Sequence, residues 1–210
     1  MEQLQNQTVE LQNQGVYALK NARGTAALGG NQWWLREIGL KPESGCGPTT
    51  AANIFWYFLH NNRHDAVSLL KLMGEIYPYA KPSPIGLMPG RFLRGTAAFA
   101  KDRGLPLRPE ILRAWPKPFW RPTAQQAAAF LRGALEKGIP AAFLMLSKGA
   151  DPTLDHWHWV TVTGVTGGAD PELLIMDNGN RKRANLQGWL EKSLLGGAFV
   201  RFTPTMKQGV

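Results

Sequence analysis

The single cysteine of the chain, Cys46, stands in a run of small residues that leads directly into the apolar stretch Ile54 to Leu59. This order predicts a buried helix with the sulfur at its N-terminal end. Unpaired backbone N–H groups and the positive end of the helix dipole stabilise a thiolate there, and such sites lower a thiol pKa from about 8.5 to roughly 3.5–7.5. Because the thiolate is the nucleophilic form, Cys46 is a candidate active-site residue.

Two histidines, His156 and His158, stand at the start of a strand predicted over residues 156–165. Because side chains alternate along a strand, both imidazoles are expected on one face and Trp157 on the other. We expect His156, Trp157 and Asn178 to lie at the wall of a substrate cleft. His158 is the histidine that a following carboxylate can orient.

That carboxylate is Asp177, at the end of the next predicted strand. The turn-forming residues 167–171 predict a chain reversal, so hairpin pairing brings His158 opposite residues 177–179. Asp177 points to the same face as the apolar residues of its own strand. It is therefore better placed than Asn178 to orient His158.

Cys46, His158 and Asp177 together provide the groups that nucleophilic acyl transfer needs. Cys46 would attack a carbonyl, His158 would hold the proton and later give it to the leaving group, and Asp177 would fix the imidazole tautomer. Singly, a buried cysteine or a strand histidine is more often structural. Their combination in one chain favours the catalytic interpretation.

Zinc binding by His156 and His158, with Cys46 and Asp177, is an alternative use of the same residues. The spacings that make a zinc site secure, Cys-x-x-Cys or His-x-x-x-His, are absent from the sequence. We therefore expect no metal and no cofactor.

The elements that must position these residues change character along the chain. Helices are predicted up to about residue 138, including helices capped by Asp65 and by a Thr123–Gln126 capping box. Strands follow from residue 140, together with one short helix capped by Asn185. This order predicts an α+β fold in which a helical lobe carrying the cysteine helix packs on a mostly antiparallel sheet. The cysteine is expected in a cleft between the two.

Residues 1–30 are polar and end in Gly29-Gly30, so we expect an N-terminal arm there, or alternatively a pro-segment that inhibits the cleft. Residues 31–210 are expected to form a single domain. The N-terminus lacks the pattern of a signal peptide, and no apolar run approaches about 18 residues. We expect no membrane span and, by default, a cytoplasmic protein.

The chain carries a net charge of +9, but its only basic run is Arg181-Lys182-Arg183. Dispersed positive charge usually aids solubility, so this run is expected to be a solvated loop, with contact to an anionic partner as the alternative. No signature of a nucleic-acid-binding module occurs, and no nucleic-acid partner is expected.

The residues around Cys46 and His158, together with Ile175-Met176-Asp177, resemble the papain-like cysteine peptidases. Within them the resemblance is strongest to the branch that includes the double-glycine peptidases of bacteriocin export systems. It covers about residues 31–203 in motif order. It implies a papain-like fold, a bacterial-type stand-alone member, a peptide or protein substrate, and Cys46, His158 and Asp177 as the catalytic triad.

One departure from the family concerns the oxyanion hole. The family's glutamine usually stands about six positions before the cysteine, where this chain has Leu40. Gln32 is the nearest upstream glutamine, and it can serve only if residues 33–44 loop out as an insertion. With the backbone N–H of Cys46 it would complete the oxyanion hole.

Three functions follow from these patterns. The first is a cysteine peptidase or amidase. The second is a thiol acyltransferase, which differs only in whether water or an amine completes the turnover. The third is a catalytically silent peptide-binding module. The four aromatic residues Trp115, Phe119, Trp120 and Trp157 could line a cleft, but most of them are expected to pack under a loop.

Overall fold

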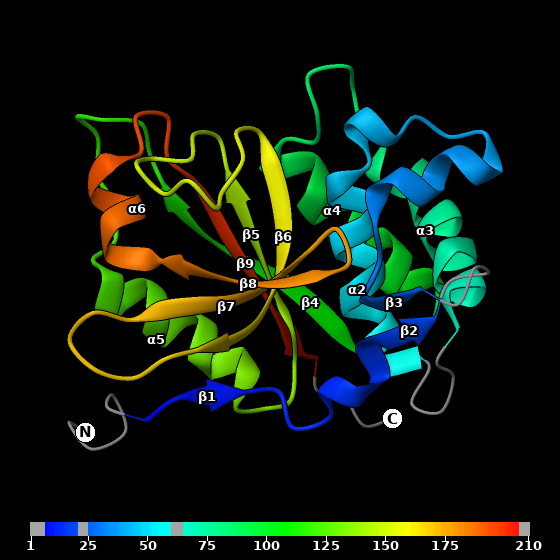
Figure 1. Cartoon of the computed structure of the whole chain (residues 1–210), viewed down its shortest axis with the longest axis horizontal. Helices are drawn as coiled ribbons and strands as arrows, with labels where there is room; N and C mark the ends of the chain where they lie inside the picture. The colour runs from blue at the N-terminus through cyan, green and yellow to red at the C-terminus, as the bar shows by residue number, and fades with distance from the viewer. Residues whose placement is uncertain (1–6, 21–24, 60–64, 206–210) are drawn as a thin grey trace.

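The computed structural model describes residues 7–20, 25–59 and 65–205, which form an α+β fold built on one large sheet (Figure 1). Its main path is β4-β9-β5-β6-β7-β8, with every neighbouring pair antiparallel, and β1 adds to β6 beyond the end of β5. The strands of this sheet are β1 (Val9–Glu10), β4 (Leu107–Ala114), β5 (Ala141–Met145), β6 (His158–Val165), β7 (Glu172–Asp177), β8 (Asn180–Asn185) and β9 (Gly197–Pro204). A small separate hairpin is formed by β2 (Ala18–Lys20) and β3 (Ala26–Leu28).

Helices cover both faces of this sheet, which explains why β5 and β6 are buried along their whole length. On one face Phe92 of α4 stacks on Trp159 of β6, and on the other Trp189 of α6 packs edge-on against Phe143 of β5. In Figure 1 the helices α2, α3 and α4 lie to the right of the sheet, and α5 and α6 lie to its left. The helices are α2 (Cys46–Leu59), α3 (Ala66–Ala80), α4 (Pro89–Asp102), α5 (Ala124–Leu135) and α6 (Leu186–Lys192). The predicted α+β fold class is confirmed.

Three helix starts predicted from capping residues are also confirmed. Asp65 caps α3 and Asn185 caps α6, each by accepting a hydrogen bond from a backbone N–H of the first turn. Thr123 and Gln126 form both hydrogen bonds of a capping box at the start of α5. These local signals are independent of tertiary contacts, which is why the sequence alone reveals them.

The chain before residue 31 packs onto the fold wherever the structure describes it. Its buried apolar side chains share one core with the helices and the sheet; they are Leu11, Val16, Tyr17 and Leu19. Arg132 holds its beginning, donating hydrogen bonds to the carbonyl oxygens of Gln7 (2.5 Å) and Thr166 (2.6 Å). The boundary at residue 31 and a role as a pro-segment stay predictions.

The basic run Arg181–Arg183 was predicted as a solvated loop, and this was wrong. It lies in β8, which pairs with β7 along its whole length. Strand β8 is an edge of the sheet, and most of its side chains are exposed or half-buried, so its sequence lacks the apolar alternation that marks a strand. Among the described residues, no helix is long and apolar enough to cross a membrane.

Candidate active site

Cys46 is the first residue of α2 and is buried. Both of its neighbours are glycines because other segments approach them closely. A Cβ atom on Gly45 would lie 2.4 Å from Cδ1 of Leu35, and one on Gly47 would lie 2.5 Å from Cδ2 of Leu87. The first backbone N–H groups of a helix have no intrahelical acceptor, so the thiol and the N–H of Cys46 lie together at the positive end of the helix dipole.

His158 and Asp177 form a hydrogen bond of 2.6 Å between Nε2 and Oδ1, and both side chains are buried. The hairpin of β6 and β7 brings them together from the start of one strand and the end of the other. The chain turns directly after Asp177 through Asn178 and Gly179, whose φ angles are 47° and 83°. Positive φ at both positions is the requirement of a type I′ hairpin turn, which the sequence Asn-Gly favours.

The imidazole of His158 lines the same narrow cleft as Cys46. Because Nε2 is bonded to Asp177, Nδ1 is the ring nitrogen left for the sulfur. Burial alone lowers the pKa of His158, but its interactions with Asp177 and Cys46 outweigh burial and raise it to about 10. Burial likewise raises the pKa of Asp177, and the hydrogen bonds from His158 and Lys182 outweigh it and lower this pKa overall. Both shifts favour an imidazolium paired with the carboxylate of Asp177 at neutral pH.

Gln32 lies in the same cleft as Cys46, His158 and Asp177, a narrow space of about 10 Å³. The twelve residues between it and the glycine of the cysteine motif fold into two compact 3-10 turns, η2 (Gln32–Ile38) and η3 (Pro42–Ser44). A Cβ atom on Gly45 would lie 3.3 Å from Cβ of Gln32, so the two segments are in direct contact. The structure thus brings Gln32 beside the cysteine in spite of the insertion.

Gln32 is buried, with 8% of the residue exposed, and its side-chain oxygen Oε1 has no hydrogen-bond partner among the described residues. Two buried side-chain oxygens lack a partner among the described residues, Gln32 Oε1 and Thr49 Oγ1, and both residues line this cleft. Buried polar groups are almost always paired, because leaving one unpaired costs about 1–3 kcal/mol. Unpaired groups gathered at one place indicate a position reserved for a ligand.

Asn178 joins the two halves of the cleft. Its side-chain Oδ1 accepts a hydrogen bond of 3.1 Å from the backbone N–H of Gln32, and its carbonyl oxygen accepts one from Nδ2 of Asn31, also 3.1 Å. The turn that carries Asp177 is therefore tied directly to the segment that carries Gln32. Asn178 was predicted at the wall of the cleft, and it lines it.

His156 and Trp157 lie elsewhere than the predicted strand geometry implied. Strand β6 begins at His158, and Trp157 has a φ of 54°, so the alternation of side chains does not extend back to His156. Neither residue is among those that line the narrow cleft, although the carbonyl oxygen of Trp157 lies 4.0 Å from Sγ of Cys46. Their role at a wider substrate surface stays a prediction.

Two charged residues near the histidine were missed. Lys182 of β8 donates a hydrogen bond of 2.6 Å to Oδ2 of Asp177, and Asp155 has a carboxylate oxygen within 4.8 Å of ligand atoms of His158 and Asp177. His156 is not part of this group, so the set of zinc ligands considered from the sequence is not assembled here. The ammonium group of Lys182 occupies the side of Asp177 where a cation would bind.

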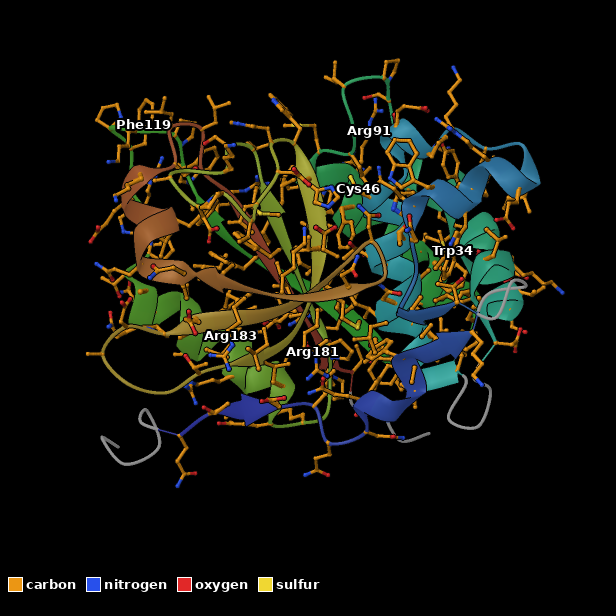
Figure 2. All side chains as sticks on the ribbon, in the orientation of Figure 1. Trp34, Cys46, Arg91, Phe119, Arg181 and Arg183 are labelled. Carbon is orange, nitrogen blue, oxygen red and sulfur yellow. The ribbon has the colours of Figure 1, made fainter. Side chains whose placement is uncertain are left out.

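A larger apolar groove of about 710 Å³ contains the aromatic residues of the proline-rich loop. Trp115, Phe119 and Trp120 line it with 48%, 68% and 58% of their surfaces exposed, so the prediction that they pack under a loop was wrong. Figure 2 places Phe119 and Cys46 toward the same upper edge of the molecule.

The register of the sheet shows how this groove relates to the cleft. Ala114, Gly197, Met145 and His158 are successive cross-strand partners on β4, β9, β5 and β6. Strands lie about 4.8 Å apart, so Gly197 at the floor of the groove is roughly 10 Å from His158. The groove therefore opens at the same end of the sheet as the histidine.

Fold and site together define an α+β protein with a buried thiol, imidazole and carboxylate in one cleft. No protein-family model matches the sequence, and no curated protein matches it significantly. Among solved structures, the chain is similar to the peptidase domain of Streptococcus ComA, a bi-functional ABC transporter involved in a quorum-sensing pathway. The similarity covers 77% of this chain and 93% of that one, with 13% sequence identity and a TM-score of 0.43. A TM-score below 0.5 is too low to transfer a function, so the function is inferred below from the residues of this chain.

Proposed function

We propose that this chain is a papain-like cysteine peptidase, a thiol hydrolase of peptide or amide bonds. The observation that carries the proposal is that Cys46, at a helix N-terminus, lines one narrow cleft with His158, whose Nε2 is bonded to Asp177. This arrangement places a nucleophile and a group that can carry its proton in the same cleft.

In the proposed reaction the thiolate of Cys46 attacks the carbonyl carbon of the scissile bond and forms a tetrahedral intermediate. The negative charge on the oxygen is stabilised by the backbone N–H of Cys46 and the carboxamide of Gln32. The imidazolium of His158 then protonates the leaving amine as the C–N bond breaks. Neutral His158 next takes a proton from water, which attacks the thioester and releases the acid and the thiolate.

The apolar groove beside the cleft supports a peptide substrate with a large apolar side chain near the scissile bond. Its open floor and its exposed indole rings offer apolar surface that is uncovered in the described part of the chain. A peptide library digested with the wild-type chain, with Cys46→Ala as the control, identifies the cleaved sequences by mass spectrometry.

The proposal is tested first without a substrate, by the pH dependence of alkylation of Cys46 with iodoacetamide. We expect the wild type to react at acidic pH, where a free thiol is unreactive, and His158→Ala to react only in the alkaline range of an ordinary thiol. His156→Ala is the matched control and should behave like the wild type, because His156 lies outside the cleft. A wild-type profile equal to that of an unfolded thiol would contradict the proposal and favour a silent binding module.

A further inference from the structure

Lys182 takes no part in the steps of the proposed reaction. Its ammonium nitrogen lies 2.6 Å from Oδ2 of Asp177, and His158 Nε2 lies 2.6 Å from Oδ1 of the same carboxylate. The two oxygens of Asp177 are thus each held by one nitrogen. The Asp177 side chain is nearly inaccessible, with 5% of it exposed, whereas the Lys182 side chain is 33% exposed.

The strand pairing explains why this lysine reaches the site. Lys182 of β8 lies directly opposite Ile175 of β7, and Asp177 lies two residues further along the same face. Diagonal neighbours of this kind are within reach of a long side chain. Arg181, its neighbour, lies opposite Met176 and points to the other face of the ladder, where it donates a hydrogen bond to Gln14.

Lys182 also contacts the loop that leads into His158. Its ammonium lies 3.4 Å from the carbonyl oxygen of Thr153, and the hydroxyl of Thr153 donates a 3.3 Å hydrogen bond to the carbonyl of Arg183. The same loop carries Asp151, whose carboxylate accepts from the backbone N–H of Asn185. Lys182 therefore stands at the junction of three parts: the carboxylate, its own strand, and the segment that delivers the histidine.

From this geometry we infer that Lys182 is a positioning residue of the proposed triad, which fixes the carboxylate of Asp177 and shares its charge with His158. A carboxylate held at one oxygen only can rotate about its last bond, which loosens the hydrogen bond that orients the imidazole. With both oxygens held, Oδ1 stays directed at Nε2. This inference rests on the proposed function.

The charge of Lys182 also acts on the Cys46–His158 pair. The charged groups around the imidazole are Cys46 from α2, Asp177 from β7, Lys182 from β8 and Asp155 from the loop between β5 and β6. Lys182 is the cation of this set besides the imidazole itself, so it favours the thiolate and disfavours the imidazolium. Cations bound to the two oxygens of one carboxylate lie roughly 5–6 Å apart. For a group that is one-third exposed, this corresponds to an effect of about 0.5–1 pH unit on the titration of the imidazole.

The test is the pH profile of Cys46 alkylation in Lys182→Met, Lys182→Arg and Arg181→Met. Lys182→Met keeps the aliphatic stem but loses the charge and the hydrogen bond. We expect the pH midpoint of its alkylation to rise by a few tenths of a pH unit. We also expect its plateau rate to fall, because the imidazole is less well oriented. Lys182→Arg should restore the pH midpoint of the wild type and most of its plateau rate. Arg181→Met also removes one positive charge, but from the other face of the strand pair. It should leave the pH midpoint and the plateau rate nearly unchanged, because the charge of Arg181 is distant and screened.

The results distinguish a failure of the proposed function from a failure of the role given to Lys182. If His158→Ala changes the wild-type profile but Lys182→Met matches Arg181→Met, the proposed function holds and the role of Lys182 is refuted. If the wild type already reacts as an ordinary thiol, both are refuted. Far-UV circular dichroism and thermal melts of each variant accompany the profiles. If Lys182→Met does not fold, Lys182→Gln is used in its place. An alkylation profile of Lys182→Gln equal to that of the wild type would likewise refute the role of Lys182.

Discussion

Replacing Gln32 by Met separates the catalytic role of this residue from any structural one. Met matches the length and shape of Gln but carries no amide, so the replacement deletes the carboxamide while filling its space. Gln32 is buried, and its side-chain oxygen Oε1 has no partner among the described residues. A residue kept for stability would not be left in this condition, because an unpaired buried polar group costs about 1–3 kcal/mol.

The expected result is a variant that is slower and at least as stable. Loss of one oxyanion donor lowers the rate of acyl transfer by about 100- to 1,000-fold. Removal of the unpaired amide leaves the free energy of unfolding unchanged or raises it by up to about 2 kcal/mol. For a domain of this size, each kcal/mol raises Tm by about 2–4 °C.

Two assays on the same protein measure these effects. Hydrolysis of p-nitrophenyl acetate forms a tetrahedral intermediate and requires the oxyanion donors, whereas alkylation by iodoacetamide forms none. Gln32→Met should therefore lose the first activity and keep the second. Gln125→Met, on the exposed start of α5, is the matched control and should change neither. Unchanged ester hydrolysis together with a lower Tm would refute the reasoning and make Gln32 a structural residue.

Three further predictions concern stability. Gly47→Ala should lower the free energy of unfolding by about 1–3 kcal/mol in a denaturant titration, because the added Cβ lies 2.5 Å from Cδ2 of Leu87. Gly15→Ala should not, because its added Cβ would meet only Oδ1 of Asn13, at an ordinary contact distance of 3.8 Å. Arg132→Met should remove the donor that holds the carbonyl oxygens of Gln7 and Thr166 and so release the start of the N-terminal segment. Limited proteolysis should cut there faster than in the wild type, and equal rates would contradict this role. The folded pKa of His158, about 10, lies above its unfolded value near 6.5, so its contribution to stability is complete below about pH 6.5 and is lost as pH rises to 10. The difference in Tm between wild type and His158→Gln should shrink over that range, and a constant difference would count against the raised pKa.

The sequence predicted those parts of the site that depend on local rules. The thiol at the start of a helix follows from small residues ahead of an apolar run, and the preference for Asp177 over Asn178 follows from parity along a strand. Gln32 was reached through the resemblance to a family and not from spacing, because its distance along the chain from Cys46 depends on how the intervening turns fold.

What the sequence could not predict depends on tertiary contacts. Lys182 belongs to an edge strand with polar residues on both faces, so nothing in its neighbourhood separates a strand from a loop. The positive φ of Trp157 is imposed by the way the chain enters β6, and alternation cannot foresee it. The groove around Trp120 joins segments that are far apart in sequence, and their apolar residues suit a packed loop equally well.

The tie between Asn178 and Gln32 has a consequence for biosynthesis. These two residues are separated by 146 positions, and Cys46 precedes the strand that carries its histidine by about 110. A ribosome adds about 5–20 residues each second, so the cysteine is made several seconds or more before its partner exists. During that interval the nascent chain carries Cys46 and Gln32 without His158 and without the Asn178 side chain that bonds to the backbone of Gln32. Under the proposed function, the site is therefore assembled only when the first and last quarters of the chain meet, and a prematurely terminated product would lack it.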